Sequence, residues 1–80
     1  MQTIKVNTNS LPWGCNFTIN DKEIAGIGSD FCNPGKYSAR FGVYASGGNI
    51  ATFADAVEFI SDAIENHFAA FGLNVEFVNA

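Results

Sequence analysis

Positive charge is scarce in this sequence and is confined to its first half. The 80 residues contain four lysine and arginine side chains against eight carboxylates, which gives a formal net charge of −4. No lysine or arginine follows Arg40. Proteins that bind nucleic acid directly use these residues to replace phosphate counterions, so the charge balance argues against direct nucleic-acid binding. It also disfavours attraction to an anionic membrane surface.

Long apolar runs are also missing from the sequence. No run approaches the roughly 20 residues that a membrane-spanning helix needs. Residues 1–5 lack the basic start and the apolar stretch of a secretory signal peptide. We therefore expect a cytoplasmic location. In that compartment Cys15 and Cys32 are expected to be reduced thiols, with a disulfide between them as the alternative.

Aromatic side chains, in contrast, are plentiful. The chain has eight Phe, two Tyr and one Trp, and 48% of its residues are apolar. A chain of this length hides only about 60% of its unfolded surface, so large aromatic side chains are needed to build a sufficient core. Repeats, low-complexity segments and linkers are absent. We expect residues 1–80 to form a single globular domain.

Alternation of apolar and polar residues predicts five strands. The alternating segments are residues 2–7, 15–19, 23–27, 37–46 and 73–77. The intervening residues 7–14 and 28–36 are rich in turn-forming Asn, Ser, Gly and Pro, which predicts loops. Residues 20–22 are expected to form a hairpin turn, and Gly47 and Gly48 are expected to end the fourth strand.

One helix is predicted over residues 53–71. Thr52 suits the N-cap position, and Asp55 three residues later resembles a capping box. Apolar residues then recur at helical spacing, and Gly72 suits the position that ends a helix. The sequence therefore predicts an α+β fold, a two-layer sandwich in which this helix covers one face of a mostly antiparallel sheet of four to five strands. The other sheet face is expected to be relatively polar.

The predicted helix carries four carboxylates on one side. Asp55, Glu58, Asp62 and Glu65 are spaced three, four and three residues apart, so at about 100° per residue they occupy an arc of about 80° opposite the apolar stripe. Like charges at such spacings each cost a few tenths of a kcal/mol in a helix. A helix selected only for stability would place lysine or arginine among them, and this one does not.

Two interpretations of this acidic arc are open. It can be a solvated face that keeps a Phe-rich protein in solution, or it can dock on a basic surface of a protein partner. We favour the docking surface, because the charges are aligned and of one sign. Phe59 lies beside the arc and is a candidate aromatic anchor. The alternative for Phe59 is partial cover by a neighbouring loop, such as the one that carries Trp13.

The sequence offers no catalytic, cofactor or metal-binding motif. His67 is the single histidine and lies on the apolar side of the helix, where we expect a packed residue. A cysteine–histidine nucleophile pair has no signature here, and two Cys with one His lack zinc-ligand spacing. Gly35 and Lys36 lack the other residues of a phosphate-binding loop. We therefore expect a protein that is not an enzyme.

In size, acidity and the arc formed by Asp55, Glu58, Asp62 and Glu65, the chain resembles in kind the anti-CRISPR proteins of phages and mobile elements. The resemblance is to the small α/β members that block type I surveillance complexes. It implies a non-catalytic inhibitor in the cytoplasm of a bacterial host cell. It also implies that its carboxylates occupy the Lys and Arg side chains with which effector subunits grip target DNA.

A second class of function remains open from the sequence. A small phage or bacterial interaction module would use exposed strand edges instead of the acidic arc. Both a monomer and a homodimer are compatible with the sequence.

Overall fold

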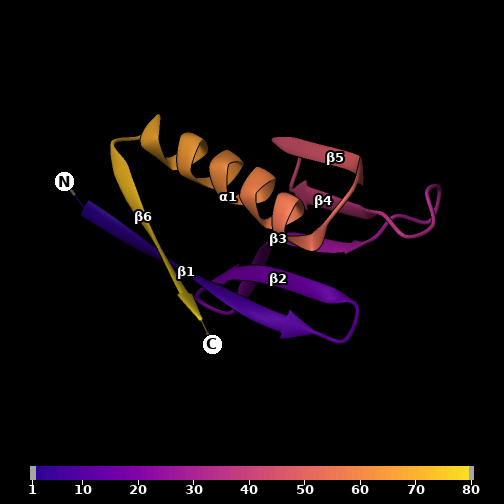
Figure 1. Cartoon of the computed structure of the whole chain (residues 1–80). Helices are drawn as coiled ribbons and strands as arrows, with labels where there is room; N and C mark the ends of the chain where they lie inside the picture. The colour runs from indigo at the N-terminus through magenta and orange to yellow at the C-terminus, as the bar shows by residue number, and fades with distance from the viewer. Residues whose placement is uncertain (1, 80) are drawn as a thin grey trace.

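The computed structural model describes residues 2–79, which form six strands and one helix (Figure 1). The elements in chain order are β1 (Gln2–Leu11), β2 (Gly14–Ile19), β3 (Lys22–Ser29), β4 (Tyr37–Phe41), β5 (Ala45–Ile50), α1 (Phe53–Ala69) and β6 (Leu73–Asn79). The strands form one sheet in the order β5-β4-β3-β2-β1-β6. β1 and β6 pair in parallel, and the other neighbours are antiparallel. The fold is therefore α+β, with one helix on a mixed sheet that is mostly antiparallel, as predicted, but has six strands instead of four to five.

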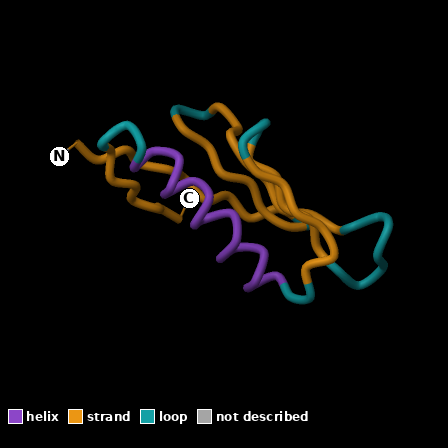
Figure 2. The backbone as a smooth tube through the Cα atoms, turned by 90° about the horizontal axis from the view of Figure 1, so that it is seen from above, coloured by secondary structure: helices purple, strands orange, loops and turns teal. Residues whose placement is uncertain are grey.

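Helix α1 lies along one face of this sheet, as Figures 1 and 2 both show. Its start is as predicted, because the Thr52 side chain accepts a hydrogen bond of 3.1 Å from the Asp55 amide. The helix ends at Ala69, two residues before the predicted end. Gly72 then adopts a φ of 76°, a left-handed conformation that glycine takes without steric cost, and the chain turns into β6.

The additional strand arises because residues 37–46 form a hairpin instead of one strand. Gly42 has a φ of 50°, and the Tyr44 amide donates a 2.9 Å hydrogen bond to the Phe41 carbonyl. The chain therefore reverses between β4 and β5. Val43, which by alternation would share a strand face with Phe41, lies in the turn and is 90% exposed. The Gly47–Gly48 pair lies inside β5 and does not end a strand.

The predicted loop over residues 7–14 is also largely strand. β1 continues to Leu11 because it pairs with β2 along this segment, with Asn9 opposite Asn16. The Asn9 side chain donates a 3.1 Å hydrogen bond to the Thr18 hydroxyl. Asn9 and Thr18 lie on the sheet face that α1 leaves uncovered, where their polar side chains bond to each other.

Gly26 and Gly28 weaken the strand signal of residues 23–27 and predict a strand that is short, bulged or at an edge. β3 is a central strand of the sheet, and its pairing with β2 shifts register between Phe17 and Thr18.

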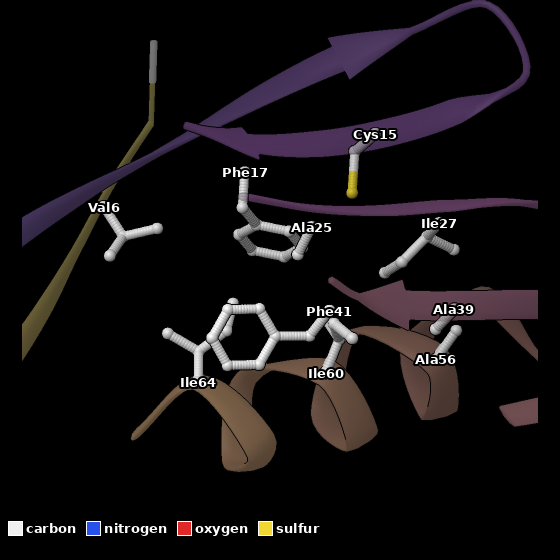
Figure 3. Packing of buried hydrophobic residues seen from close by; sticks show 10 residues of the cluster. All are labelled: Val6, Cys15, Phe17, Ala25, Ile27, Ala39, Phe41, Ala56, Ile60 and Ile64. Carbon is white, nitrogen blue, oxygen red and sulfur yellow. The ribbon is translucent and has the colours of Figure 1, made fainter. Parts of the chain in front are cut away.

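The core lies between α1 and the covered sheet face. Phe17 and Val6 from the sheet and Ile60 and Ile64 from the helix are fully buried, and Figure 3 shows them pointing toward one another. At about 2 kcal/mol for each fully buried side chain of this kind, this contact supplies much of the stability of so small a domain. It also fixes the rotation of α1, and with it the helix face that meets solvent.

Candidate functional site

The four helix carboxylates form one exposed row on α1, which we call the acidic ridge. Asp55, Glu58, Asp62 and Glu65 are all exposed. The buried residues of α1 are Ala56, Ile60 and Ile64. At about 100° per residue, the middle of the ridge lies about 180° around the helix from the middle of this buried set. The ridge therefore faces directly away from the core.

The acidic ridge also carries the entire net charge of the chain. Outside α1 four carboxylates balance the four cations. The carboxylates are Asp21, Glu23, Asp30 and Glu76, and the cations are Lys5, Lys22, Lys36 and Arg40. The formal charge of −4 is therefore that of one helix face, and its field is of one sign.

Two of the strand cations, Arg40 and Lys5, lie on the side of the sheet opposite the ridge. Arg40 stands between Ala39 and Phe41, which are both buried against the helix side, so its own side chain is on the uncovered sheet face. There its Nε donates a 3.2 Å hydrogen bond to the Gly42 carbonyl. Lys5 precedes the buried Val6 and shares this uncovered face. Neither side chain lies on the ridge side of the sheet.

Phe59 lies at the side of the ridge that faces β5. It is 38% exposed, and its ring lies 3.2 Å from the point where a Cβ at Gly47 would stand. The cover over Phe59 therefore comes from β5 and not from the loop of Trp13. Because part of the ring remains open beside the carboxylates, Phe59 offers an apolar contact at the border of the charged surface.

The loop formed by residues 30–36 is held in place by the Asp30 carboxylate, and we call it the clamped loop. The sequence did not predict it as an ordered feature. The Asp30 carboxylate accepts hydrogen bonds from the Asn49 amide at 2.6 Å, the Cys32 amide at 2.9 Å and the Asn33 side chain at 3.0 Å. The loop projects at the end of the molecule where α1 begins (Figure 1), and Phe31 on it is 97% exposed. The sequence predicted only a loop over residues 28–36, because the hydrogen bond from Asn49 to Asp30 joins segments that are distant in the sequence.

Replacing Asp30 by asparagine is expected to loosen this loop and to change its pH dependence. The Asn49 amide, followed by the Asn33 side chain, lowers the pKa of Asp30 from its usual range. A lowered folded-state pKa means that the stabilisation is present above the unfolded-state pKa, about 3.9, and is lost as the pH falls through the folded-state value.

Hydrogen exchange of the Asn49 amide tests this expectation. In the wild type the exchange of this amide, corrected for the intrinsic rate, should accelerate at acid pH. In Asp30→Asn it should be severalfold faster already at neutral pH, with less further change on acidification. Asp21→Asn, in the β2–β3 turn, is the control. If the Asn49 amide exchanged at the same rate in Asp30→Asn and in the wild type at neutral pH, the Asp30 carboxylate would not be what holds this loop.

The two cysteines and His67 are the other residues considered as candidate reactive groups. Cys15 and Cys32 are free thiols; Cys15 is buried, which raises its pKa, and Cys32 is exposed. His67 is half-buried among aromatic rings, with centroids 4.2 Å from Tyr44 and 5.2 Å from Phe41. Among residues 2–79 no three His, Cys, Asp or Glu side chains are grouped as metal ligands. Within the same residues no helix is long and apolar enough to span a membrane.

No protein-family model matches the chain, and comparisons with curated proteins and with solved structures likewise gave no match.

Proposed function

We propose that the acidic ridge docks on a basic, nucleic-acid-binding surface of a protein partner. In this proposal the chain is a non-catalytic inhibitor of the anti-CRISPR kind, and the partner is a type I surveillance complex whose binding to target DNA it blocks. The observation that carries the proposal is the location of the charge. The whole net charge of −4 lies on one exposed helix face, and the other charges of the chain balance in number.

The spacing of the ridge suits competition with DNA. Asp55 and Glu65 are ten residues apart, which at about 1.5 Å per residue places four carboxylates along about 15 Å. This is about one charge per 5 Å, against one per about 3.4 Å along a DNA strand. Lysine and arginine side chains that grip a DNA backbone therefore meet a similar row of anions on α1. Phe59 at the border adds an apolar contact that DNA backbone lacks.

The proposal is tested by measuring how the purified protein competes with target DNA for a purified type I surveillance complex. Asp62→Asn/Glu65→Gln removes two ridge charges, and we expect it to weaken inhibition by at least about tenfold at about 50 mM salt. The effect should shrink at about 200 mM salt, because screening weakens exposed charges. Substituting all four ridge carboxylates by lysine should abolish inhibition while leaving the far-UV circular dichroism spectrum unchanged.

A matched control separates the ridge from overall charge. Asp21→Asn/Glu76→Gln removes the same two residue types and changes the net charge equally, at exposed positions outside α1. We expect it to inhibit as the wild type does. Equal losses in the two double variants would argue that overall charge, and not the ridge, drives binding. If the wild type fails to displace DNA even at low salt, the type I surveillance complex is the wrong partner.

The alternative, an interaction module that binds through strand edges, has specific candidates in β5 and β6. These are the two outer strands of the sheet, and β5 carries no charged residue that would guard its edge. A partner bound in this way is held by main-chain hydrogen bonds. Its binding would resist salt and would survive substitution of the four ridge carboxylates.

A further inference from the structure

The uncovered sheet face contains a shallow hollow with a floor of small residues. Its volume is about 530 Å³, and its floor includes Gly26 and Gly28 of β3. In the sheet register Gly28 lies opposite Ser38, and Gly26 lies opposite Arg40. The backbone is therefore accessible over the middle of the sheet, so that a large side chain from outside can approach it closely.

The single tryptophan of the chain stands at this hollow. Trp13 is 63% exposed, and its ring lies 3.7 Å from the point where a Cβ at Gly28 would stand. One side of the indole thus rests along the glycine floor while most of its surface meets solvent. Exposed tryptophan and arginine beside a hollow are the residue types that most often anchor protein interfaces, and Arg40 lines the same hollow.

Lys5 and Arg40 on the uncovered face are matched in number by Glu76 and Glu23. Lys5 of β1 lies beside Glu76 of β6 in the sheet register. Arg40 and Glu23 both line the hollow. Two copies that bring these faces together therefore meet no net repulsion, and a twofold axis can place Arg40 of each copy near Glu23 of the other. Apposing the α1 faces, in contrast, would place four carboxylates against four.

From this charge pattern and the hollow, we propose that two copies of this chain associate through their uncovered sheet faces. Each Trp13 keeps one side of its ring on its own Gly28 and packs its exposed side against the hollow of the other copy, and both acidic ridges point outward. A neutral, self-complementary face with an aromatic anchor suits a second copy better than a nucleic acid or an anionic membrane, which require an excess of cations. The proposal does not depend on what the ridge binds.

Sedimentation equilibrium tests the association directly. Between about 10 µM and about 500 µM, at about 0.15 M salt, the weight-average mass should rise from the 8.6 kDa of one chain toward twice that value. Because Trp13 is the single tryptophan, its fluorescence should move to longer wavelength on dilution, with the same midpoint concentration. A constant chain mass and constant emission over this range would overturn the proposal.

Two variants test whether the dimer interface lies on the uncovered sheet face. Trp13→Ala and Arg40→Glu are each expected to weaken dimerisation by at least about tenfold. Arg40 is exposed, so Arg40→Glu should fold normally even if Trp13→Ala proves unstable. Dimers that persist unchanged in Arg40→Glu would overturn the face-to-face arrangement, because edge-to-edge pairing of strands would survive this change.

Two controls complete the design. Phe31→Ala removes another exposed aromatic, outside the hollow, and should leave dimerisation unchanged. Asp62→Asn/Glu65→Gln removes ridge charge and should change the dimer dissociation constant by less than about twofold, because charges farther apart than about 8 Å are screened at physiological salt. If this double variant loses inhibition but still dimerises, the ridge and the dimer interface are separate surfaces. The two proposals can then fail independently of each other.

Discussion

Phe17→Ala should lower the free energy of unfolding by about 3–5 kcal/mol, the cost typical of emptying a buried phenylalanine site. Phe17 is 1% exposed, and its ring meets Phe77 edge-on with centroids 6.0 Å apart. The ring thereby links β2 to β6 across β1, which lies between them in the sheet. For a domain of this size the total stability is on the order of 4–12 kcal/mol. The substitution therefore removes a large share of it.

Urea unfolding measures this loss. The midpoint should fall in Phe17→Ala while the slope stays near the wild-type value, because the exposed surface of the unfolded chain is almost the same. Phe31→Ala removes the same atoms from a side chain that is 97% exposed, and it should cost no more than about 0.5 kcal/mol. Similar costs for the two variants would mean that Phe17 does not occupy the core.

Gly14→Ala should be the second severe change, with a loss of more than about 2 kcal/mol. A Cβ at Gly14 would collide with the backbone carbonyl of Ile27 on β3. The expected destabilisation comes from this collision and not from backbone strain, since Gly14 does not have a positive φ. Backbone cannot yield as a flexible side chain does, so the start of β2 must move away from β3. The neighbouring Cys15–Ile27 register pair should be disturbed with it.

Gly28→Ala is the matched control for this collision. Gly28 is a strand residue on the neighbouring β3, and a Cβ there meets only the Trp13 ring at an ordinary 3.7 Å. Its thermal unfolding, measured at a concentration below that of dimerisation, should stay within about 1 kcal/mol of the wild type. Equal destabilisation by the two substitutions would show that the close contact of Gly14 with β3 is not the cause.

The acidic ridge and the helix start could be predicted because both depend on local sequence. Thr52 and Asp55 are three residues apart, and helical periodicity alone decides which side chains face the core. The hairpin at Gly42 was missed because alternation continues without a break from Phe41 through Val43. The positive φ of Gly42 and the hydrogen bond from the Tyr44 amide to the Phe41 carbonyl distinguish the turn from a strand in the structure.

Contacts between segments that are far apart in the sequence could not be predicted from local patterns. The parallel pairing of β1 with β6 has no local signal, since an alternating strand can pair in either direction. The bond from Asn49 to Asp30 and the contact of Phe59 with Gly47 likewise depend on how the strands are ordered. The uncovered face was expected to be polar, but its balance of charges becomes visible only once the strands are placed side by side.

The parallel pairing of β1 with β6 has a consequence for how the chain folds. Gln2 lies beside Leu73 in the sheet, so this pair closes a far longer loop than the hairpins that connect β1 through β5. Longer loops cost more entropy to close, so we expect the hairpins to form first. During synthesis the edge of β1 that pairs with β6 then stays unpaired until α1 and β6 have been synthesised. That interval exposes a strand edge to neighbouring chains, and docking of the α1–β6 unit ends the exposure.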